Sequence, residues 1–269
     1  MTNVKWVVRD TVYKEMKNKT ILIVFVLNII ILLASSFGID FIFDYVSSGT
    51  DINFNNEKIG MFKFFINFWT SVLCLLFGTS SIRSDEEAGI LGQILTLPIK
   101  RGEYLLGRWL GASLLVSAFY IIMVIIGTVI FALSGKGFPW SAYLPLGILG
   151  NIAFVMCLIL VTMGVGLFFN KLIAFLVSII FYVFLQASVS SYHDLPFERF
   201  FENFNAMKFL GLILYTFFPH LKSISNFGDS LMLGDSLDGF NYSFELIHLI
   251  LSTAFIFWLV TKIFNRKEA

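Results

Sequence analysis

Charged residues are scarce in this 269-residue chain. They make up 14% of it, against about 25% in typical soluble domains. Hydrophobic residues account for 57%, and 32 residues are phenylalanine. So few charges cannot cover the surface of a soluble domain of this size, and the composition therefore indicates a membrane protein. The net charge is +1 and no basic block with interleaved aromatics occurs, so we expect no nucleic-acid partner.

Motifs for catalysis and metal binding are also missing. The sequence has no Walker A pattern, no H-E-x-x-H, no C-x-x-C and no nucleophile elbow, so we predict that the chain hydrolyses no ATP and has no catalytic residue. Its three histidines are scattered along the sequence. Its two cysteines, Cys74 and Cys157, both fall in apolar runs, so no disulfide is expected.

The alternative to a chain without bound metal is a copper site. Met156, Cys157 and Met163 lie near one side of an apolar run, and such sulfur ligands suit Cu(I). Methionine also serves as a gap-filling residue in apolar bundles, and we therefore predict no metal site.

Six apolar runs are long enough to cross a bilayer, which takes about 20 helical residues. They cover residues 20–39, 59–82, 104–133, 143–168, 172–190 and 244–264. No linker, charge block or repeat divides the chain, so the sequence predicts one domain, residues 1–269, forming an all-α integral membrane protein with six transmembrane helices. The shorter apolar stretch Met207–Phe218 is interpreted as a re-entrant or interfacial segment.

The distribution of lysine and arginine predicts the orientation. With six spans both termini lie on one side, and that side carries thirteen of the nineteen Lys and Arg residues. Because these residues concentrate in cytoplasmic loops, we expect cytoplasmic termini and an outer segment at 191–243 in a cytoplasmic or inner membrane. The arm 1–19 has apolar residues at helical spacing opposite its bases. This pattern predicts an interfacial amphipathic helix, the alternative being a solvated arm.

The connector between the second and third runs has the signals of a separate short helix. Ser84 and Glu87 have the spacing of a capping box, and acids fill the predicted first turn. Apolar residues then recur at helical spacing, and Pro98 ends the pattern. We predict a cytoplasmic helix at 84–97 whose apolar side lies on the membrane, on the rest of the protein or on a partner.

The stretch EAGILGQILTLPIKRGEYLLGR, from Glu87 to Arg108, resembles the signature of type-2 ABC exporter permeases. In that family the segment is the coupling helix, which docks on a separate ATPase subunit. The resemblance implies that six residues couple the chain to the ATPase: Glu87, Gly89, Leu91, Leu95, Pro98 and Arg101. Ile90, Gly92 and Arg108 stand where the family usually has threonine, glutamate and lysine.

The resemblance also implies partners and a mechanism. The expected assembly is two permease chains, identical or different, with two ATPase subunits that hold ATP and Mg²⁺, while this chain binds no cofactor itself. The stretches Phe218–Leu221 and Asn226–Asp229 resemble an outer motif of the branch named for multicopper-enzyme maturation, with His220 replacing its first asparagine. Membrane lipid is the surrounding partner. The alternative is a non-transporting membrane scaffold or assembly factor.

Two sets of residues within the predicted spans have further expected roles. Gly107 and Gly111 have the small-xxx-small spacing that lets helices approach closely in lipid, either within the chain or across a dimer. Charged residues are almost absent from the spans, which argues against an ion-coupled carrier. We therefore expect an amphiphilic cargo, with a route along aromatic residues of the second and fifth runs: Phe65, Phe68, Trp69, Phe181 and Phe184. The other possibility for these rings is contact with lipid or bundle packing.

Overall fold

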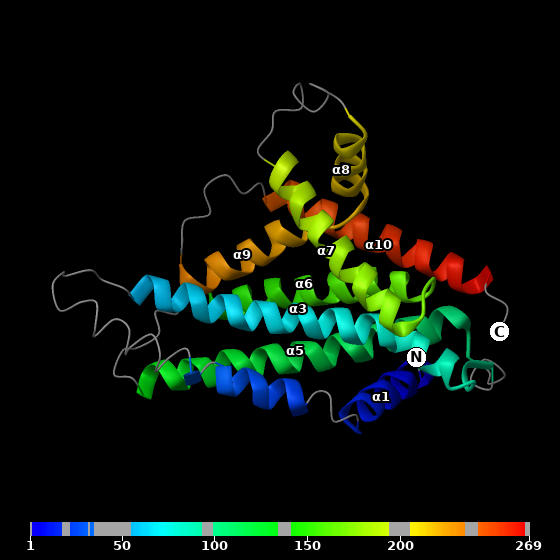
Figure 1. The fold of residues 1–269 in the computed structure, drawn as a ribbon, viewed down its shortest axis with the longest axis horizontal. Helices are drawn as coiled ribbons and strands as arrows, with labels where there is room; N and C mark the ends of the chain where they lie inside the picture. Colours follow the sequence, from blue (N-terminus) through cyan, green and yellow to red (C-terminus); the bar gives the residue numbers. More distant parts are fainter. Residues whose placement is uncertain are drawn as a thin grey trace.

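The structure, a computed structural model, describes residues 2–17, 22–31, 33–34, 55–92, 99–133, 141–193, 205–234 and 242–266. All regular structure in these ranges is helical. The principal helices, labelled in Figure 1, are α1 (Thr2–Lys17), α3 (Asn55–Glu87), α5 (Arg101–Leu133), α6 (Leu144–Gly166), α7 (Lys171–Tyr192), α8 (Ala206–Phe217), α9 (Leu221–Leu233) and α10 (Tyr242–Arg266).

Five of the six predicted spans are confirmed as long apolar helices. They are Phe62–Glu87, Arg101–Ile130, Leu144–Gly166, Lys171–Tyr192 and Ser243–Arg266. The first predicted span, residues 20–39, lies partly outside the described residues. Its described part is the apolar helix Leu22–Ile31, so a sixth crossing stays a prediction.

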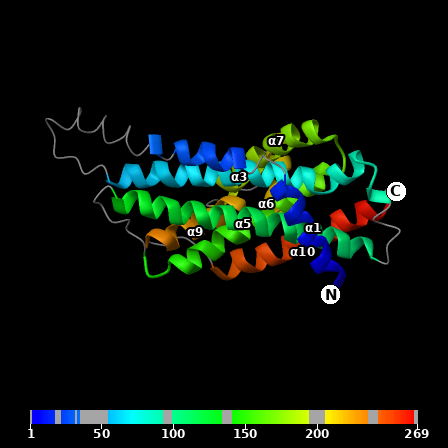
Figure 2. The ribbon, with the colours of Figure 1, turned by 90° about the horizontal axis from the view of Figure 1, so that it is seen from below.

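Helix α6 occupies the centre of the bundle. It packs against α3, α5, α7, α9 and α10, while α3 and α5 run alongside it (Figures 1 and 2). The outer faces of α7 and α10 are rich in exposed apolar side chains such as Ile180, Val183, Ile250 and Leu251. Exposed apolar faces of this size are costly in water and favourable in lipid, which fits helices at the periphery of a membrane bundle.

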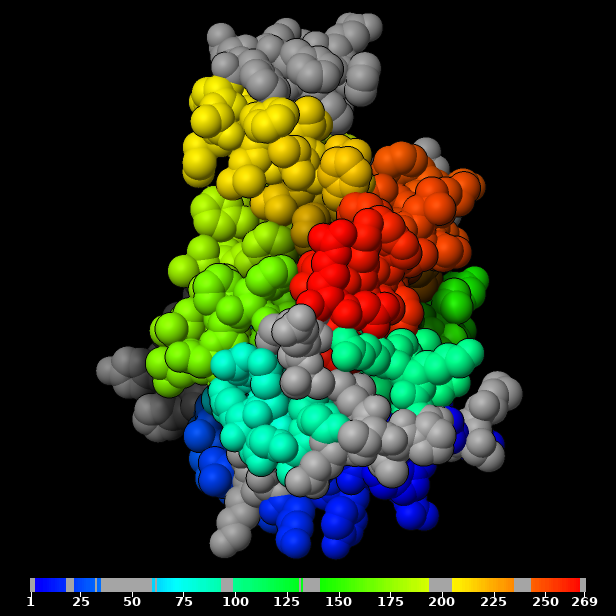
Figure 3. Space-filling view, turned by 90° about the vertical axis from the view of Figure 1, so that its right-hand side faces the viewer, coloured from blue at the N-terminus to red at the C-terminus, as the bar shows by residue number. Residues whose placement is uncertain are grey.

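Both chain ends lie at one end of the bundle (Figure 1). We call this the terminal end; there α3 ends, α5 begins, and α10 ends close to the start of α5. Figure 3 views it, with the end of α10 beside the starts of α5 and α7 and with α1 below them. Helix α7 ends and α10 begins away from the terminal end, near α8 (Figure 1), and we call this region the distal end.

Two helices, α8 and α9, occupy the predicted outer segment. Helix α8 packs on α7 and covers the apolar stretch Met207–Phe218, whose interpretation as a re-entrant or interfacial segment stays a prediction, whereas no sequence pattern predicted α9. Helix α9 lies against α6, where Gly147 of α6 faces Gly228 of α9. A Cβ added to Gly147 would lie 2.5 Å from the Gly228 carbonyl oxygen, so the two backbones meet too closely for any side chain between them.

The expectation that a separate helix begins at Ser84 is wrong. Helix α3 continues to Glu87, and Gly89 ends it with φ of +68°. The Ile90 and Gly89 amides donate to the carbonyls of Asp85 and Glu86, at 3.1 and 3.0 Å, in the pattern of a Schellman motif. Acids at a helix C-terminus oppose the helix dipole. Here bases offset that cost, because Arg83 pairs with Glu86 and Arg108 pairs with Asp85.

Helix α1 packs on α5 through the two glycines of the small-residue pattern. A Cβ on Gly107 would lie 2.6 Å from Val7 Cβ, and one on Gly111 would lie 2.7 Å from Thr11 Cβ. The small-residue pattern of Gly107 and Gly111 therefore forms a contact within the chain, between α5 and α1. The buried side of α1 carries Val7 and Thr11, while Trp6, Tyr13 and Met16 are exposed. The predicted amphipathic arm thus forms a helix with one side buried against α5, and Met16 does not belong to that side.

Candidate functional site

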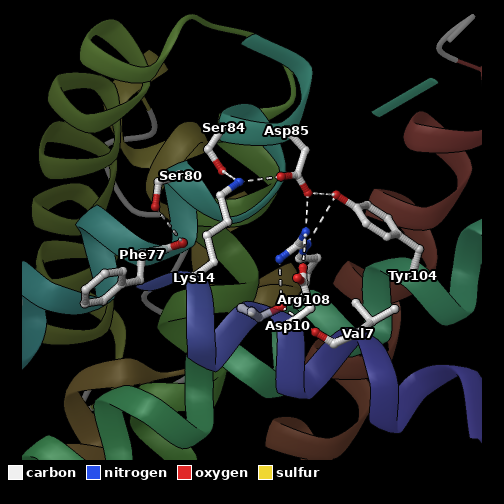
Figure 4. A network of polar contacts seen from close by, with 10 residues as sticks. Val7, Asp10, Lys14, Phe77, Ser80, Ser84, Asp85, Tyr104 and Arg108 are labelled. Atoms are coloured by element: carbon white, nitrogen blue, oxygen red, sulfur yellow. Dashed lines mark hydrogen bonds and ion pairs between the residues drawn. The ribbon is translucent and has the colours of Figure 1, made fainter. Parts of the chain in front are cut away.

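A buried ion cluster lies at the terminal end, where α1, α3 and α5 meet (Figure 4). Asp85 of α3 is fully buried, and Arg108 of α5 is 2% exposed. One carboxylate oxygen of Asp85 accepts from Nη2 of Arg108, and the other accepts from Nζ of Lys14 on α1. The Tyr104 hydroxyl also donates to Asp85, at 2.6 Å.

Arg108 joins this carboxylate to α1. Its Nη1 donates to the Thr11 hydroxyl at 3.0 Å, and its Nη2 lies 3.0 Å from a carboxylate oxygen of Asp10. Its Nε donates to the Tyr104 hydroxyl at 3.3 Å. All three nitrogen atoms of the guanidinium therefore have partners. Tyr104 extends the cluster to α10, because its ring stacks on Phe264 at 5.9 Å.

The cluster fixes the relative positions of four helices. A charge removed from water is destabilising unless its partner and its remaining hydrogen-bonding groups are all satisfied. Asp85 and Arg108 meet that condition only while α1 and α5 stay in register with α3. A displacement of one helix would leave a buried charge without its partners, so the cluster favours movement of these helix ends as one unit.

The described residues predicted to couple to an ATPase surround this cluster. Glu87 accepts from the backbone amide of Lys171 at 3.3 Å, at the first residue of α7. Arg101 donates to the carbonyl of Asn265 at 3.1 Å, at the end of α10. Leu91 is 8% exposed and belongs to the core, whereas its neighbour Ile90 is 36% exposed. Leu95 and Pro98 lie outside the described residues.

The aromatic residues of the expected cargo route form two groups. On α3, Phe68 stacks on Phe64 at 6.0 Å and contacts Trp69 at 5.5 Å; Phe65 packs against the core. On α7, Phe181 meets Phe218 edge-on at 5.1 Å. Phe184 lines a cavity of about 330 Å³ between α7 and α8, together with Tyr192, Lys208 and Leu214. The sequence-predicted rings thus belong to different surroundings, and only Phe184 lines this cavity.

A second polar cluster lies deeper in the bundle, between α3, α6 and α9. Asp229 accepts from the amides of Asn67 and Asn151, at 3.0 and 3.2 Å, and Lys63 lies 3.5 Å away. Burial raises the pKa of Asp229 above its ordinary value, against the opposing effects of Lys63 and the two amides. This cluster fixes α9, which no sequence pattern had placed inside the bundle.

Local patterns do not predict either cluster, because Asp85 falls in the expected first turn of a separate helix and Asp229 falls in the expected outer segment. The available signal was a pair of opposite charges close to the ends of apolar runs: Asp85 after the second run and Arg108 within the third. Ionisable residues at such positions need partners from other helices. Lys14 and Asp10, from the predicted interfacial arm, supply part of that need.

The fold and the cluster define a multi-pass helical membrane protein whose helix ends are locked together at one side of the bundle. The profile of the family described as ABC-2 family transporter protein matches residues 6–193, and the chain belongs to this family. It is therefore the membrane permease component of an ABC transporter, a non-catalytic subunit. Permeases of this family generally pair with ABC ATPase subunits, which bind the ATP. Among curated proteins, none matches the sequence.

Proposed function

We propose that the chain is the permease subunit of an ATP-driven exporter, with six spans including residues 20–39. In this proposal two such chains, identical or different, pair with two ATPase subunits, and the 84–101 region transmits ATPase closure to the bundle. The observation that carries the proposal is the Asp85–Arg108 cluster beside this region. A push on the end of α3 would move α1, α3 and α5 together.

The exposed residues at the terminal end support a docking surface there. Ile90 is more than a third exposed directly after the end of α3, whereas Leu91 turns into the core. Trp6, Tyr13 and Met16 of α1 are exposed beside Lys5 and Arg9, a combination that suits the headgroup layer. Docking on an ATPase at Ile90 and contact of α1 with lipid are thus compatible.

An amphiphilic cargo fits the described surfaces best. The cavity between α7 and α8 combines apolar walls with a lysine and two serines. The outer faces of α7 and α10 are apolar, so a second chain or lipid would cover them. We propose that Phe184 and its cavity lie on the cargo route, and that Phe65 and Trp69 of α3 serve mainly packing.

Isolation of the chain with its ATPase tests the proposal. The full-length protein, with a cleavable affinity tag, is extracted from its native membrane in mild detergent and analysed by mass spectrometry and native mass determination. We expect a complex of two permease chains and two ABC ATPase subunits that hydrolyses ATP. Isolation of a stable chain without any ATPase would contradict the proposal and favour the scaffold alternative.

The proposed orientation predicts the side from which introduced cysteines react. Lys100 is exposed at the terminal end and Ser191 is exposed at the distal end, whereas the natural Cys74 and Cys157 are buried. A membrane-impermeant maleimide added to intact cells should label Ser191→Cys and leave Lys100→Cys unlabelled until the cells are opened. The unsubstituted chain is the control and should stay unlabelled. Labelling of both variants from outside would contradict cytoplasmic termini.

A further inference from the structure

Three metal-ligating side chains converge at the distal end although they are far apart in the sequence. They are His193 at the end of α7, His220 between α8 and α9, and Glu245 in the first turn of α10. One ligand atom from each residue lies within 4.8 Å of the other two. His220 and Glu245 are 1% and 3% exposed, so two of the three residues are buried.

The hydrogen bonds of His220 determine where its protons lie. Its Nε2 is 2.9 Å from the carbonyl oxygen of Tyr215, and a carbonyl only accepts. Nε2 therefore carries a proton, and a neutral ring has a lone pair on Nδ1. This Nδ1 is 3.1 and 3.0 Å from the two oxygens of Glu245, which also only accept. Either a proton shared between His220 and Glu245 or a metal ion must therefore lie between these facing lone pairs.

His193 supplies a further nitrogen without a hydrogen-bond partner. Its Nδ1 is buried and makes no hydrogen bond, although it lies 3.3 Å from Oε1 of Glu245. A proton on His220 would satisfy the His220–Glu245 pair and leave this nitrogen unpaired. A metal ion between the three side chains would bind all of them, and this difference favours the metal.

The surroundings hold the His220 ring in one orientation. Tyr215 stacks on it at 4.2 Å and His248 stacks on it at 3.9 Å. The bond from Nε2 to a backbone carbonyl is the outer-shell contact that metal-binding histidines usually make. His248 directs its Nε2 to the carbonyl of Thr216, at 3.1 Å, and so belongs to the support of the site.

We propose that His193, His220 and Glu245 form a binding site for a divalent first-row metal ion of the Zn²⁺ type. Two imidazoles and one carboxylate are a known zinc ligand set, in which a water or another group completes the tetrahedron. Sulfur ligands are the ones that select Cu(I), and this site has none, so it differs in chemistry from the sulfur residues around Cys157. The bound ion would join the ends of α7, α9 and α10. The His193 side chain is 25% exposed, which gives the ion a way in.

Metal analysis of the purified full-length chain tests this site. The protein carries a histidine-free affinity tag, and a chelator removes any bound metal. Calorimetry then follows its titration with ZnCl₂, and elemental mass spectrometry measures the amount of metal bound per chain. We expect one Zn²⁺ per chain and a rise in melting temperature with Zn²⁺. Co²⁺ in place of Zn²⁺ should give the visible absorption of a tetrahedral ion.

Two variants identify the ligands, and one controls for general damage. His193→Ala and Glu245→Gln should both lose stoichiometric Zn²⁺ binding and the Zn²⁺-dependent rise in melting temperature. Met207→Ala, at an exposed position of α8 at the same end, should retain binding. His193 is partly exposed, so its replacement leaves the fold intact even if Glu245→Gln does not. No stoichiometric binding by the parent chain, equal binding by His193→Ala, or loss of binding in Met207→Ala would overturn the proposal and leave a proton-sharing His220–Glu245 pair.

Discussion

Arg108→Met is expected to cost the protein about 3–5 kcal/mol of stability, the usual loss when one partner of a buried ion pair is removed. The substitution keeps much of the side-chain volume and removes the charge. Asp85, which is fully buried, would then keep Lys14 and Tyr104 as partners but lose the guanidinium. Thr11 and Asp10 on α1 would lose their contacts with α5. We therefore expect a large fall in the melting temperature of the detergent-solubilised protein and release of α1 to proteolysis.

Arg83→Met is the matched control for this prediction. Arg83 lies at the same end of the bundle and pairs with Glu86 and Glu87, whose side chains are 32% and 42% exposed. Exposed pairs of this kind contribute about 0–1 kcal/mol, so the control should melt close to the parent. Adding Asp85→Asn to Arg108→Met should recover part of the loss, because it removes the uncompensated charge. Equal melting temperatures for Arg108→Met and Arg83→Met would show that the cluster does not hold the helix ends.

Gly147→Val is expected to separate α9 from α6. A Cβ at this position would lie 2.4 Å from Met232 Cγ and 2.5 Å from the Gly228 carbonyl oxygen. The methionine can move, but the carbonyl belongs to the backbone of α9, so the helix itself must shift. Overpacking of this kind costs about 1–3 kcal/mol. The shift would also stretch the bonds of Asp229 to Asn67 and Asn151, which adds to the loss.

Gly60→Val provides the control, because a Cβ added to Gly60 meets nothing within 4 Å. Both substitutions put a valine in a helix, so their intrinsic helix propensities change alike. Thermal unfolding should therefore show a marked loss for Gly147→Val and little change for Gly60→Val. Similar curves for the two variants would mean that α9 does not lie against α6 as described.

The long helices could be predicted from the sequence because each depends on its own composition. A run of about 20 apolar residues forms a helix in lipid whatever its neighbours are. Helix α9 was harder to predict because its residues mix Leu221 and Leu231 with Ser223, Asn226 and Asp229. Its burial depends on partners from α3 and α6, which its own sequence does not reveal.

The buried ion cluster around Asp85 and the proposed metal site could not be predicted from local patterns, because their members come from distant parts of the chain. Ser84 and Glu87 have the spacing of a helix start, yet Arg108 and Lys14 stabilise Asp85 as part of a helix end. Contacts from α1 and α5 therefore determine that this turn ends a helix and does not begin one. His193, His220 and Glu245 likewise meet only because the end of α7 lies beside the starts of α9 and α10.

ATP hydrolysis by the purified permease–ATPase complex carrying Ile90→Asp tests the central claim most directly. Ile90 is exposed just after α3, so aspartate there should leave the permease folded but prevent apolar docking on the ATPase. Phe209→Asp, at an exposed position of α8 at the distal end, is the matched control. We predict that Ile90→Asp loses permease-dependent ATP hydrolysis while Phe209→Asp retains it. Normal hydrolysis by a folded Ile90→Asp complex would contradict a coupling role for the segment after α3.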